Sequence, residues 1–466
     1  MSFYAPVPLG SRFDATRQAL DTGTTVCDAL PATLVHAAAA EEGIDLDDSA
    51  ATIYTPTLTL WTYVSQVLSG HNNCVAAVAR LVVLLLALGR PPCAAHTGAY
   101  CKARVKLELP LLRRLTYAVG HATEDQAPSE WRCLGRRTVL VDGCEVIADD
   151  TPANQAVYPQ PRSQRPGLGF PMIRLVVLIG LATASIVGAA WGPYSGKETG
   201  ETALFRQLLD QLRAGDLVVA DRYYCSYWMI ALLVGLQVDV VFRLHQRRRC
   251  DFRRGRRLGP QDHVVTWTKP QRPDWMSAEL YAQLPDTLAI RELRFRVSQR
   301  GYRSREIVVA TTLLEARCDR RTDISDIYQQ RWQVELDLRS IKQTLSLDHI
   351  HCQSPEMIDR HLWVSLLGYN LVRKVMALAA AQHQLSPRQL SFAGALQILE
   401  EFRWQLLAED ATGTLQPLVL RAIAAQRVGD RPGRVEPRRV KRRRDKYQNL
   451  QQPRAAARAE LLSENN

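Results

Sequence analysis

The 466-residue sequence contains no CxxC pair, although it has ten cysteines scattered along the chain. Zinc knuckles and dithiol redox motifs place two cysteines at that spacing. Its absence argues against a zinc site and fits free thiols in a reducing compartment. The cluster of His349, His351 and Cys352 does contain metal-binding side chains. A surface loop after a helix is the simpler explanation for it.

The sequence also lacks a long uninterrupted apolar run and a secretion signal. Residues 175–191 are apolar, but glycine, threonine and serine interrupt them, and the stretch falls short of the roughly 20 residues that cross a bilayer. The first residues carry no basic patch followed by an apolar core. We therefore expect two buried strands in residues 175–191 and a protein that stays inside the cell. No internal repeat is evident.

Positive charge is what the sequence has in excess. Lys and Arg number 59 against 47 Asp and Glu, which gives a net charge of +12. A surplus of this size favours a polyanionic partner such as nucleic acid. Ribosomal and membrane-surface proteins are equally basic, so charge alone does not decide the partner. With 46% hydrophobic and 23% charged residues, the composition excludes wholesale disorder.

The length predicts two to four structural units, at roughly 150 residues each. Residues 1–125 carry apolar side chains at three- and four-residue spacing, with helices expected at 58–68, 75–88 and 100–109. We interpret this part as a helical N-terminal domain. From residue 126 the pattern changes to short β-branched runs, which marks a second unit.

Residues 126–244 alternate between strand and helix patterns. Strands are expected where compact β-branched or apolar runs occur, and helices where the period lengthens. The expected strands are 138–141, 175–179, 184–190, 217–220 and 238–244, and the expected helices are 198–212 and 227–236. A Pro- and Gly-rich loop fills 149–171. This alternation predicts an α/β fold with a mixed sheet flanked by helices.

A basic, β-leaning segment at 245–305 is interpreted as an insertion. It opens with the arginines Arg247, Arg248, Arg249, Arg253, Arg254, Arg256 and Arg257. The core pattern then resumes over 306–350, with a strand at 307–313 and a long helix at 324–345 that Asp323 or Ser325 would cap. Further helices are expected in 351–425. Residues 426–466 are expected to form a basic disordered tail, which either contacts phosphates or is simply solvated.

Three carboxylates stand out in this arrangement. Asp142 and Asp221 each follow a buried β-branched run, so two strands of one sheet can bring both to the same edge. A single aspartate in such a place is usually a turn former or a helix cap. On the helix at 324–345, Tyr328, Arg331, Glu335 and Lys342 fall within an arc of roughly 60° at 100° per residue. An amphipathic helix with an exposed Arg331–Glu335 pair is the alternative explanation of this stripe.

The spacing Tyr328-x2-Arg331-x3-Glu335-x6-Lys342 resembles the YREK signature of the DDE transposases of insertion-sequence family four. The segments 142–143, 150–155, 166–171, 221–223 and 369–373 resemble that family in the same order. The resemblance covers roughly residues 50–380. It implies an RNase H-like core with a β-rich insertion, an N-terminal helical domain that binds DNA, and C-terminal helices that aid dimerisation.

For the active site, the resemblance implies that Asp142, Asp221 and Glu335 hold two Mg²⁺ ions, with Mn²⁺ as a substitute, and that Asp142 contacts both ions. Tyr328, Arg331 and Lys342 would bind phosphates beside them. The implied reaction is cut-and-paste transposition, by a homodimer on transposon ends and target DNA. The implied location is cytoplasmic, at the nucleoid, with no nucleotide cofactor and no membrane partner.

Three points stay open from the sequence. Family members flip a base onto an aromatic ring during hairpin formation, and Trp267 and Trp275 are candidates for that ring, although core packing is the simpler role for both. Other DNA contacts are expected from the insertion at Arg247, Arg248, Arg249, Arg253 and Arg254. The rival functions are an RNase H-like nuclease such as a junction resolvase, and a catalytically silent DNA-binding protein derived from a transposase.

Overall fold

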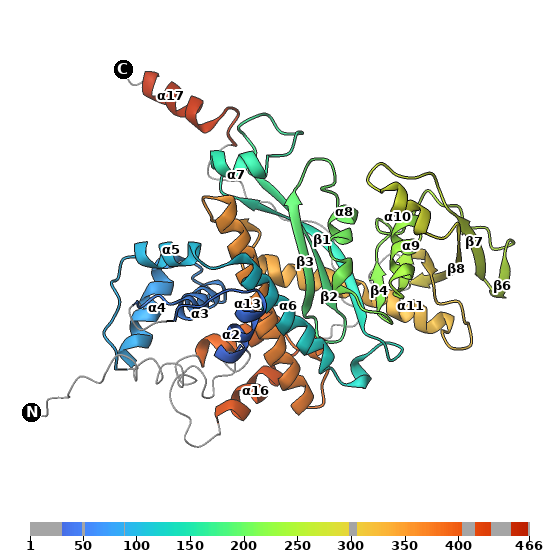
Figure 1. Cartoon of the computed structure of the whole chain (residues 1–466), viewed down its shortest axis with the longest axis horizontal. Coiled ribbons are helices and arrows are strands. Elements are labelled where there is room, and N and C mark those ends of the chain that lie inside the picture. The colour runs from blue at the N-terminus through green and yellow to red at the C-terminus, as the bar shows by residue number, and fades with distance from the viewer. Residues whose placement is uncertain are drawn as a thin grey trace, which may run out of the picture.

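The computed structural model describes residues 30–48, 52–87, 89–297, 305–402, 415–429 and 449–464. A ten-stranded mixed sheet forms the centre of the molecule, with the N-terminal helices at one end and a strand-rich extension at the other (Figure 1). Helices α6 (Leu109–Asp125) and α13 (Pro355–Gln382) pack against each other between the N-terminal helices and the strands. The α/β mixed sheet predicted from the sequence is confirmed.

The strand order of the sheet is β3-β2-β1-β4-β5-β9-β8-β7-β6. Its first half pairs antiparallel from β3 to β1 and parallel from β1 to β5, which is the RNase H-like arrangement that the resemblance implies. These strands are β1 (Thr138–Ala148), β2 (Met172–Gly180), β3 (Ile186–Pro193), β4 (Leu217–Ala220) and β5 (Asp239–Arg243). The short β10 (His349–Ile350) pairs with β1 off this path.

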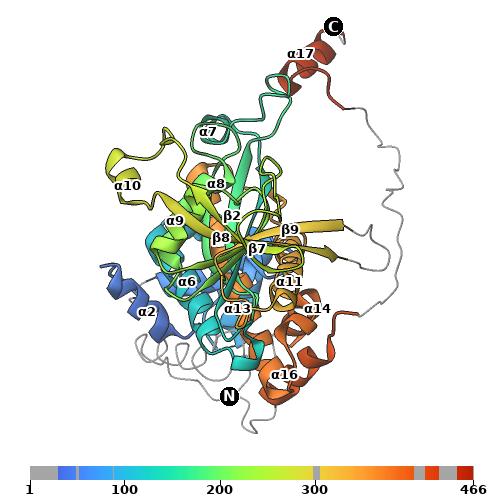
Figure 2. The same ribbon diagram turned by 90° about the vertical axis from the view of Figure 1, so that its right-hand side faces the viewer.

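The central strands are buried on both faces, which explains their continuous apolar runs. Side chains alternate between the two faces, so Leu140 and Val219 join one core while Val141 and Ala220 join the other. The first core contains α6 (Leu109–Asp125), α11 (Arg321–Gln330), α12 (Trp332–Arg339) and α13 (Pro355–Gln382). The second contains α8 (Glu201–Arg206) and α9 (Tyr227–Gly235). Figure 2 shows α8 and α9 on one side of the strands and α11 on the other.

Helices occupy the described part of the N-terminal region, as the periodicity predicts. They are α2 (Ala32–Glu41), α3 (Pro56–Val67), α4 (Cys74–Ala87), α5 (Gly98–Val105) and α6. Helix α13 packs against both α3 and α6, so N-terminal and C-terminal helices share one layer. Asn370 joins them to the sheet: its amide donates to the carbonyls of Thr116 and Ile186 and accepts from the Ile186 N–H.

The segment after β5 extends the sheet rather than forming a separate body. Its elements are β6 (Arg256–Gly259), β7 (Asp262–Thr268), α10 (Ala278–Gln283) and β8 (Thr287–Val297), and β9 (Arg305–Thr311) connects them antiparallel to β5. The predicted β-rich character of this segment is confirmed. The buried ion pair between Arg291 and Asp262, at 2.6 Å, fixes β8 against the start of β7.

The structure corrects two boundaries near the predicted carboxylates. Strand β1 does not end at Asp142 but continues to Ala148, because Val146 and Ala148 are buried and β2 pairs along the whole strand. The helix expected at 198–212 is shorter, since α8 ends at Arg206 and only a 3-10 turn, Leu209–Gln211, follows.

The helix that carries the predicted third acid starts earlier than expected and is divided. Arg320, not Asp323 or Ser325, precedes its first residue, and Asp323 pairs with Arg320 instead of capping. Arg331 keeps helical dihedral angles between α11 and α12, but the Arg331 N–H bonds back to Tyr328 in a tighter turn. A π-helical turn, Ser340–Thr344, follows α12. The path is a single helix interrupted twice.

The remaining helices are mostly C-terminal. They are α7 (Pro152–Val157), α14 (Phe392–Glu401), α16 (Leu415–Ala425) and α17 (Arg454–Glu464), with 3-10 turns at Ser129–Trp131 and Pro387–Gln389. The tail was expected to lack regular structure, whereas α17 is a helix because its alanine, arginine and leucine residues are good helix formers. The arginine cluster at 438–446 lies outside the described residues. In the described part, α13 is long and apolar enough to cross a membrane, and it is mostly buried inside the protein.

Candidate active site

The central strands bring Asp142 and Asp221 close together. Strands β1 and β4 run parallel, and Leu140 opposite Val219 is their last paired position; Asp142 lies two residues further along β1, and Asp221 directly follows β4. The two carboxylates are near enough for Asp221 to raise the pKa of Asp142. Neighbouring strands are about 4.8 Å apart. Asp142 alternates with Val141 along β1 and faces α12, where Arg331 Nη1 lies 3.7 Å from its carboxylate. The prediction that two strands deliver both carboxylates to one place agrees with this register.

Arg331 links the third carboxylate to this pair. Its Nη2 donates to Glu335 at 2.7 Å, and its Nη1 lies 3.7 Å from Asp142. Glu335 stands on the first turn of α12, which packs against β1. The side chains of Asp142 and Arg331 are 20% and 16% exposed, and that of Glu335 is 36% exposed, so the group is half-buried but open to an incoming ligand.

The charges of this group are not balanced by protein cations. The pKa of Asp142 is raised to about 6, chiefly by burial and also by the nearby Glu201 and Asp221 carboxylates, while the Gly143 N–H and Arg331 act to lower it. The Asp142 carboxylate accepts from Gly143 at 2.9 Å, and that of Asp221 accepts from the Tyr223 N–H at 2.7 Å. Several carboxylate oxygens in a half-buried place with one guanidinium form a donor set that suits hard divalent cations.

The other two residues of the predicted stripe are placed differently. Tyr328 is only 5% exposed and packs against Phe295, with ring centroids 6.1 Å apart; burial raises its pKa to about 12. Lys342 lies in the π-helical turn and donates to the carbonyl of Glu145 on β1, at 2.7 Å. Arg331 and Lys342 thus reach β1, whereas Tyr328 packs inward. A buried phenol supports the position of Arg331 better than it contacts DNA.

A fourth carboxylate that was not predicted from the sequence, Glu201 at the start of α8, lies near Asp142. The Glu201 side chain lies against Gly143, where an added Cβ would come within 2.8 Å of its carboxyl carbon, and it accepts from Tyr224 at 3.3 Å. Burial raises its pKa. The signal in the sequence was the Asp142-Gly143 pair itself, because glycine at 143 leaves room for this acid. Trp332, next to Arg331, was also missed and is 45% exposed.

Comparison with known proteins supports the assignment that this geometry suggests. The sequence model of the transposase DDE domain matches residues 135–371, which include Asp142, Asp221 and Glu335. The chain belongs to the DDE transposases. It is also similar to the transposase InsG of insertion sequence element IS4 from Escherichia coli K12, with 28% identity over 470 residues, covering 94% of this chain and 96% of that protein. The protein is therefore a DDE transposase of the IS4 family, and the family implies a divalent metal and DNA as partner.

The predicted aromatic and basic DNA contacts of the transposase are partly inaccessible. Trp267 is 4% exposed, and Arg248 lies over its ring at 3.6 Å, so the ring has no free face for a base and Arg248 is only partly exposed. Trp275 is covered by Arg206 at 3.8 Å. These positions agree with core packing for both tryptophans. The more accessible arginines of the set are Arg247, Arg249, Arg253 and Arg254.

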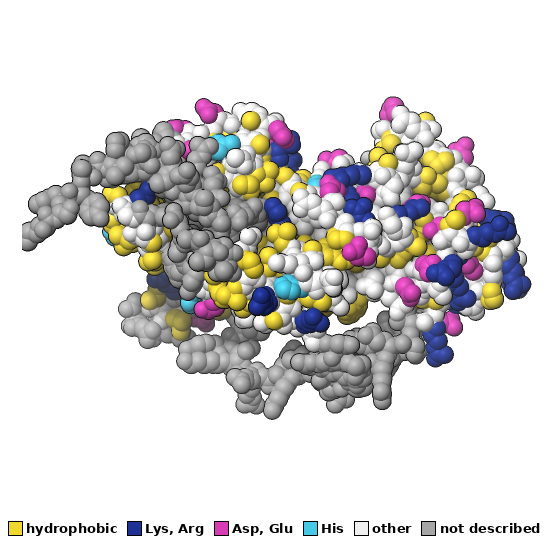
Figure 3. All heavy atoms as spheres, turned by 90° about the horizontal axis from the view of Figure 1, so that it is seen from below, with side chains coloured by type: hydrophobic (Ala, Val, Ile, Leu, Met, Phe, Trp, Pro, Cys, Tyr) yellow, Lys and Arg dark blue, Asp and Glu magenta, His cyan; other side chains and the backbone are white. Residues whose placement is uncertain are grey.

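Basic side chains gather at the insertion end of the transposase. On the face shown in Figure 3, Lys and Arg lie close together at the right-hand end, which carries β6 to β8 in Figure 1. Arg253 and Arg254 are 90% and 84% exposed, and each lies near the Asp251 carboxylate, at 2.9 and 3.5 Å. Asp251 is one acid against two exposed arginines, so this loop carries a net positive charge.

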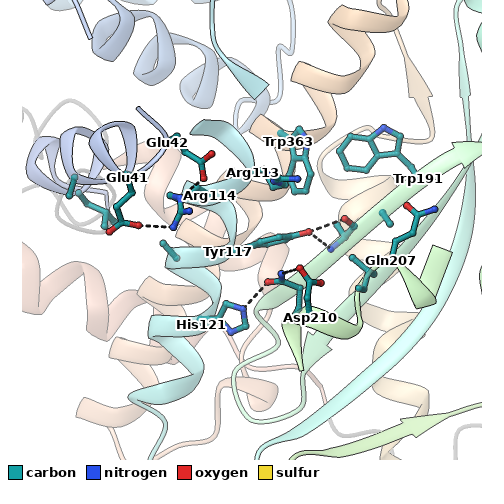
Figure 4. A pocket seen from close by; sticks show the side chains of 18 residues that line it. Glu41, Glu42, Arg113, Arg114, Tyr117, His121, Trp191, Gln207, Asp210 and Trp363 are labelled. Carbon is teal, nitrogen blue, oxygen red and sulfur yellow. Dashed lines mark hydrogen bonds and ion pairs between the residues drawn. The ribbon is translucent and has the colours of Figure 1, made fainter. Parts of the chain in front are cut away.

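A pocket of about 650 Å³ lies away from the three carboxylates, between α2, α6 and β3. Figure 4 shows Tyr117 at its centre, where the hydroxyl donates to the carbonyl of Ala189, and Arg114 paired with Glu41 and Glu42. Its rim mixes acids and bases and includes none of the predicted site residues. The candidate site at Asp142, Asp221 and Glu335 is therefore separate from this cavity.

Proposed function

We propose that this transposase cuts DNA at the ends of its element and joins the freed 3′-OH to target DNA, using Asp142, Asp221 and Glu335. The observation that carries the proposal is the convergence of these acids: the pairing of β1 with β4 brings the first two near each other, and Arg331 contacts the first and the third. A pair of Mg²⁺ ions, or Mn²⁺ in their place, would neutralise charge on the phosphate and activate the attacking oxygen.

The roles of the protein groups follow from their positions. Asp221 lies near Asp142, and Arg331 contacts both Asp142 and Glu335, which supports a role for Asp142 in contacting both cations, while Asp221 and Glu335 would each hold one. Arg331 has a planar fork already positioned between two carboxylates, and the same fork matches a phosphate. Asp142 lies within β1 and Asp221 directly after β4, and these two strands are paired, so the sheet holds the two acids near each other.

Strand transfer can be tested separately from cutting. The substrate is pre-cleaved element-end DNA carrying either a 3′-OH or a 3′-deoxy terminus, with Mg²⁺ and a supercoiled target. The proposal predicts that only the 3′-OH end is joined. Cutting of uncleaved ends without any joining would favour the nuclease alternative. Binding of ends with neither cutting nor joining would favour a silent DNA-binding protein.

Removing the charge of Lys342 is expected to weaken DNA binding more than metal binding. Its ammonium now donates to a backbone carbonyl on the strand of Asp142, so it can reach a phosphate beside the acids. We expect Lys342→Ala to bind element-end DNA roughly tenfold more weakly, with Mn²⁺ affinity unchanged, as measured by fluorescence anisotropy and isothermal titration. Lys342→Arg keeps the charge and serves as the control. Unchanged end-DNA affinity in Lys342→Ala would contradict this role.

The accessible arginines of the insertion are expected to set the salt dependence of binding. For duplex DNA, the slope of log K against log salt becomes shallower by about 0.9 for every phosphate that the protein no longer neutralises. A variant with Arg247, Arg249, Arg253 and Arg254 changed to Gln should therefore show a slope shallower by about 2 to 4. Arg421→Gln on α16 is the control for charge outside the insertion. An unchanged slope would show that these arginines do not bind phosphates.

The transposase is further proposed to act as a homodimer on paired ends, with the N-terminal helices contacting end DNA and the C-terminal helices aiding assembly. The support for this is the IS4-family membership and the layer that α13 forms with α3 and α6. Light scattering with and without end DNA measures the stoichiometry. A complex of one chain with one end at saturating DNA, with no species that contains two chains and two ends, would contradict the dimer.

A further inference from the structure

Three metal-binding side chains converge inside the insertion, far along the chain from the catalytic acids. Cys250 precedes β6, His263 lies on β7 and Glu292 lies on β8, and one ligand atom from each lies within 4.8 Å of the others. The Cys250 Sγ is 3.7 Å from His263 Nε2, which is 3.2 Å from Glu292 Oε2. His263 and Glu292 are 1% and 5% exposed.

Neighbouring groups orient these atoms toward a common point. His263 Nδ1 lies 2.7 Å from the carbonyl of Arg254, which only accepts, so the Nδ1 carries a proton and a neutral ring turns its Nε2 lone pair toward Glu292. The Trp267 Nε1–H donates to Glu292 Oε1 at 3.0 Å and leaves Oε2 facing the histidine. Metal ligands commonly have such outer hydrogen-bond partners: here the Arg254 carbonyl accepts from the histidine, and the Trp267 N–H donates to the carboxylate.

The distances match those of a tetrahedral cation site. Zinc lies about 2.0–2.2 Å from nitrogen and oxygen ligands and about 2.3 Å from sulfur, so ligand atoms at tetrahedral angles are roughly 3.3–3.6 Å apart. The two measured separations, 3.2 and 3.7 Å, are close to this. We propose that Cys250, His263 and Glu292 bind a zinc-like divalent cation, with water in the fourth position. Thiolate and imidazole ligands favour such an ion over Mg²⁺.

A second group with suitable side chains, Asp149, His349 and His351, is less suited to a cation. His349 and His351 both lie about 3 Å from the same oxygen of Asp149, and Gln353 donates to the other oxygen. The histidines can satisfy this carboxylate as hydrogen-bond donors, and His351 is 73% exposed. The cluster in the insertion differs because its histidine proton is already directed away, toward Arg254.

The cation would fasten the arginine-rich loop to the sheet. Cys250 lies in that loop, whereas the other two ligands lie on paired strands β7 and β8. Phe252 packs beside His263, with ring centroids 4.7 Å apart, and the exposed Arg253 and Arg254 follow directly. If the insertion binds DNA as proposed above, the bound ion holds these arginines in place; the site itself does not depend on that function.

Cobalt substitution in the full-length protein tests the site. Co²⁺ bound by a thiolate gives a near-ultraviolet charge-transfer band, which the all-oxygen catalytic site cannot produce. We expect this band in the wild type. It should persist in excess Mg²⁺, and it should disappear when a chelator removes the cobalt or when equimolar Zn²⁺ displaces it. Cys250→Ser should lower Co²⁺ affinity more than about tenfold, whereas Cys318→Ser, at an exposed free cysteine, should not.

The alternative is a metal-free cluster in which a protonated His263 pairs with Glu292 and Cys250 remains a neutral thiol. It predicts no thiolate–cobalt band in the folded wild type, and that result would overturn the proposal without the need for a variant. A band that survives Cys250→Ser would also overturn it. Circular dichroism checks that the variants fold. Because the readout is a spectrum and not DNA cleavage, failure here is distinguishable from failure of the proposed transposition chemistry.

Discussion

Glu335→Gln is expected to lower the rate of element-end cleavage more than about 100-fold while the protein stays folded and binds DNA. Glutamine keeps the shape of the side chain and can still accept from Arg331, but it loses the negative charge that a divalent cation requires. Changing a group that only orients a metal ligand lowers metal affinity or activity by about 10–100-fold, so loss of the ligand itself should lower the cleavage rate more. Single-turnover cleavage of labelled end DNA in Mg²⁺ measures the effect.

The control for Glu335→Gln is Glu315→Gln, which makes the same chemical change at an exposed acid before α11. It should cleave at the wild-type rate. Wild-type cleavage by Glu335→Gln would remove Glu335 from the active site. Loss of DNA binding along with cleavage would instead show that the Arg331–Glu335 pair mainly supports the local structure, which is the amphipathic-helix alternative.

Asp337→Ala is expected to destabilise the transposase by about 3–5 kcal/mol, the cost of removing one partner from a buried ion pair. The Asp337 carboxylate is 1% exposed and accepts from Arg373 at 2.9 Å and from Arg388 at 2.6 Å. Its removal leaves two guanidinium groups near the core without their acid. Urea unfolding followed by circular dichroism measures the change in the free energy of unfolding.

The ion pair between Asp337 and Arg373 also links the segment 369–373 to the helix that carries Glu335. Arg373, on α13, contacts Asp337, which lies two residues after Glu335 on α12. The interaction therefore fixes the helix that carries the third acid. Asp326→Ala, at an exposed acid on α11, is the control and should change stability by no more than about 0.5 kcal/mol. Equal unfolding curves for Asp337→Ala and Asp326→Ala would refute the ion-pair account.

The sheet was predictable because its strands carry their own signal. Residues 217–220 and 175–179 are continuous apolar runs, as strands buried on both faces must be, and they form β4 and most of β2. The end of β1 was misplaced because Asp142-Gly143 has turn-forming residues, whereas pairing with β2 carries the strand through them. Local propensity was overridden there by the neighbouring strand.

Contacts in the site were predictable from the sequence when both residues lie on one helix or strand. They were not predictable when the two residues lie on elements that are far apart in the chain. The spacing of Arg331 and Glu335 on one helix gave their pairing, but no spacing predicts that Tyr328 packs against Phe295. Glu201 was missed because its nearness to Asp142 arises from the packing of α8 against Gly143. The interruptions around Arg331 and Lys342 contain no Gly or Pro, so periodicity could not show them.

The cysteines illustrate the same limit. Chain spacing argued against a zinc site because no CxxC pair exists, yet Cys250, His263 and Glu292 come together from a loop and two strands. His263 lies 13 residues after Cys250 and 29 residues before Glu292, and these separations match none of the spacing rules used to recognise metal sites in a sequence. Strand pairing between β7 and β8 places His263 opposite Glu292, which only the register reveals.

Affinity cleavage by bound iron shows whether Asp142, Asp221 and Glu335 form one divalent-metal site. Fe²⁺ replaces Mg²⁺ in the complex with element-end DNA, and ascorbate with peroxide then cuts the protein chain next to the bound iron. A single shared site gives breaks near residues 142, 221 and 335 that excess Mg²⁺ suppresses and that Asp142→Asn removes together. Breaks confined to the regions of 149 and 349–351, or to the insertion, would contradict it.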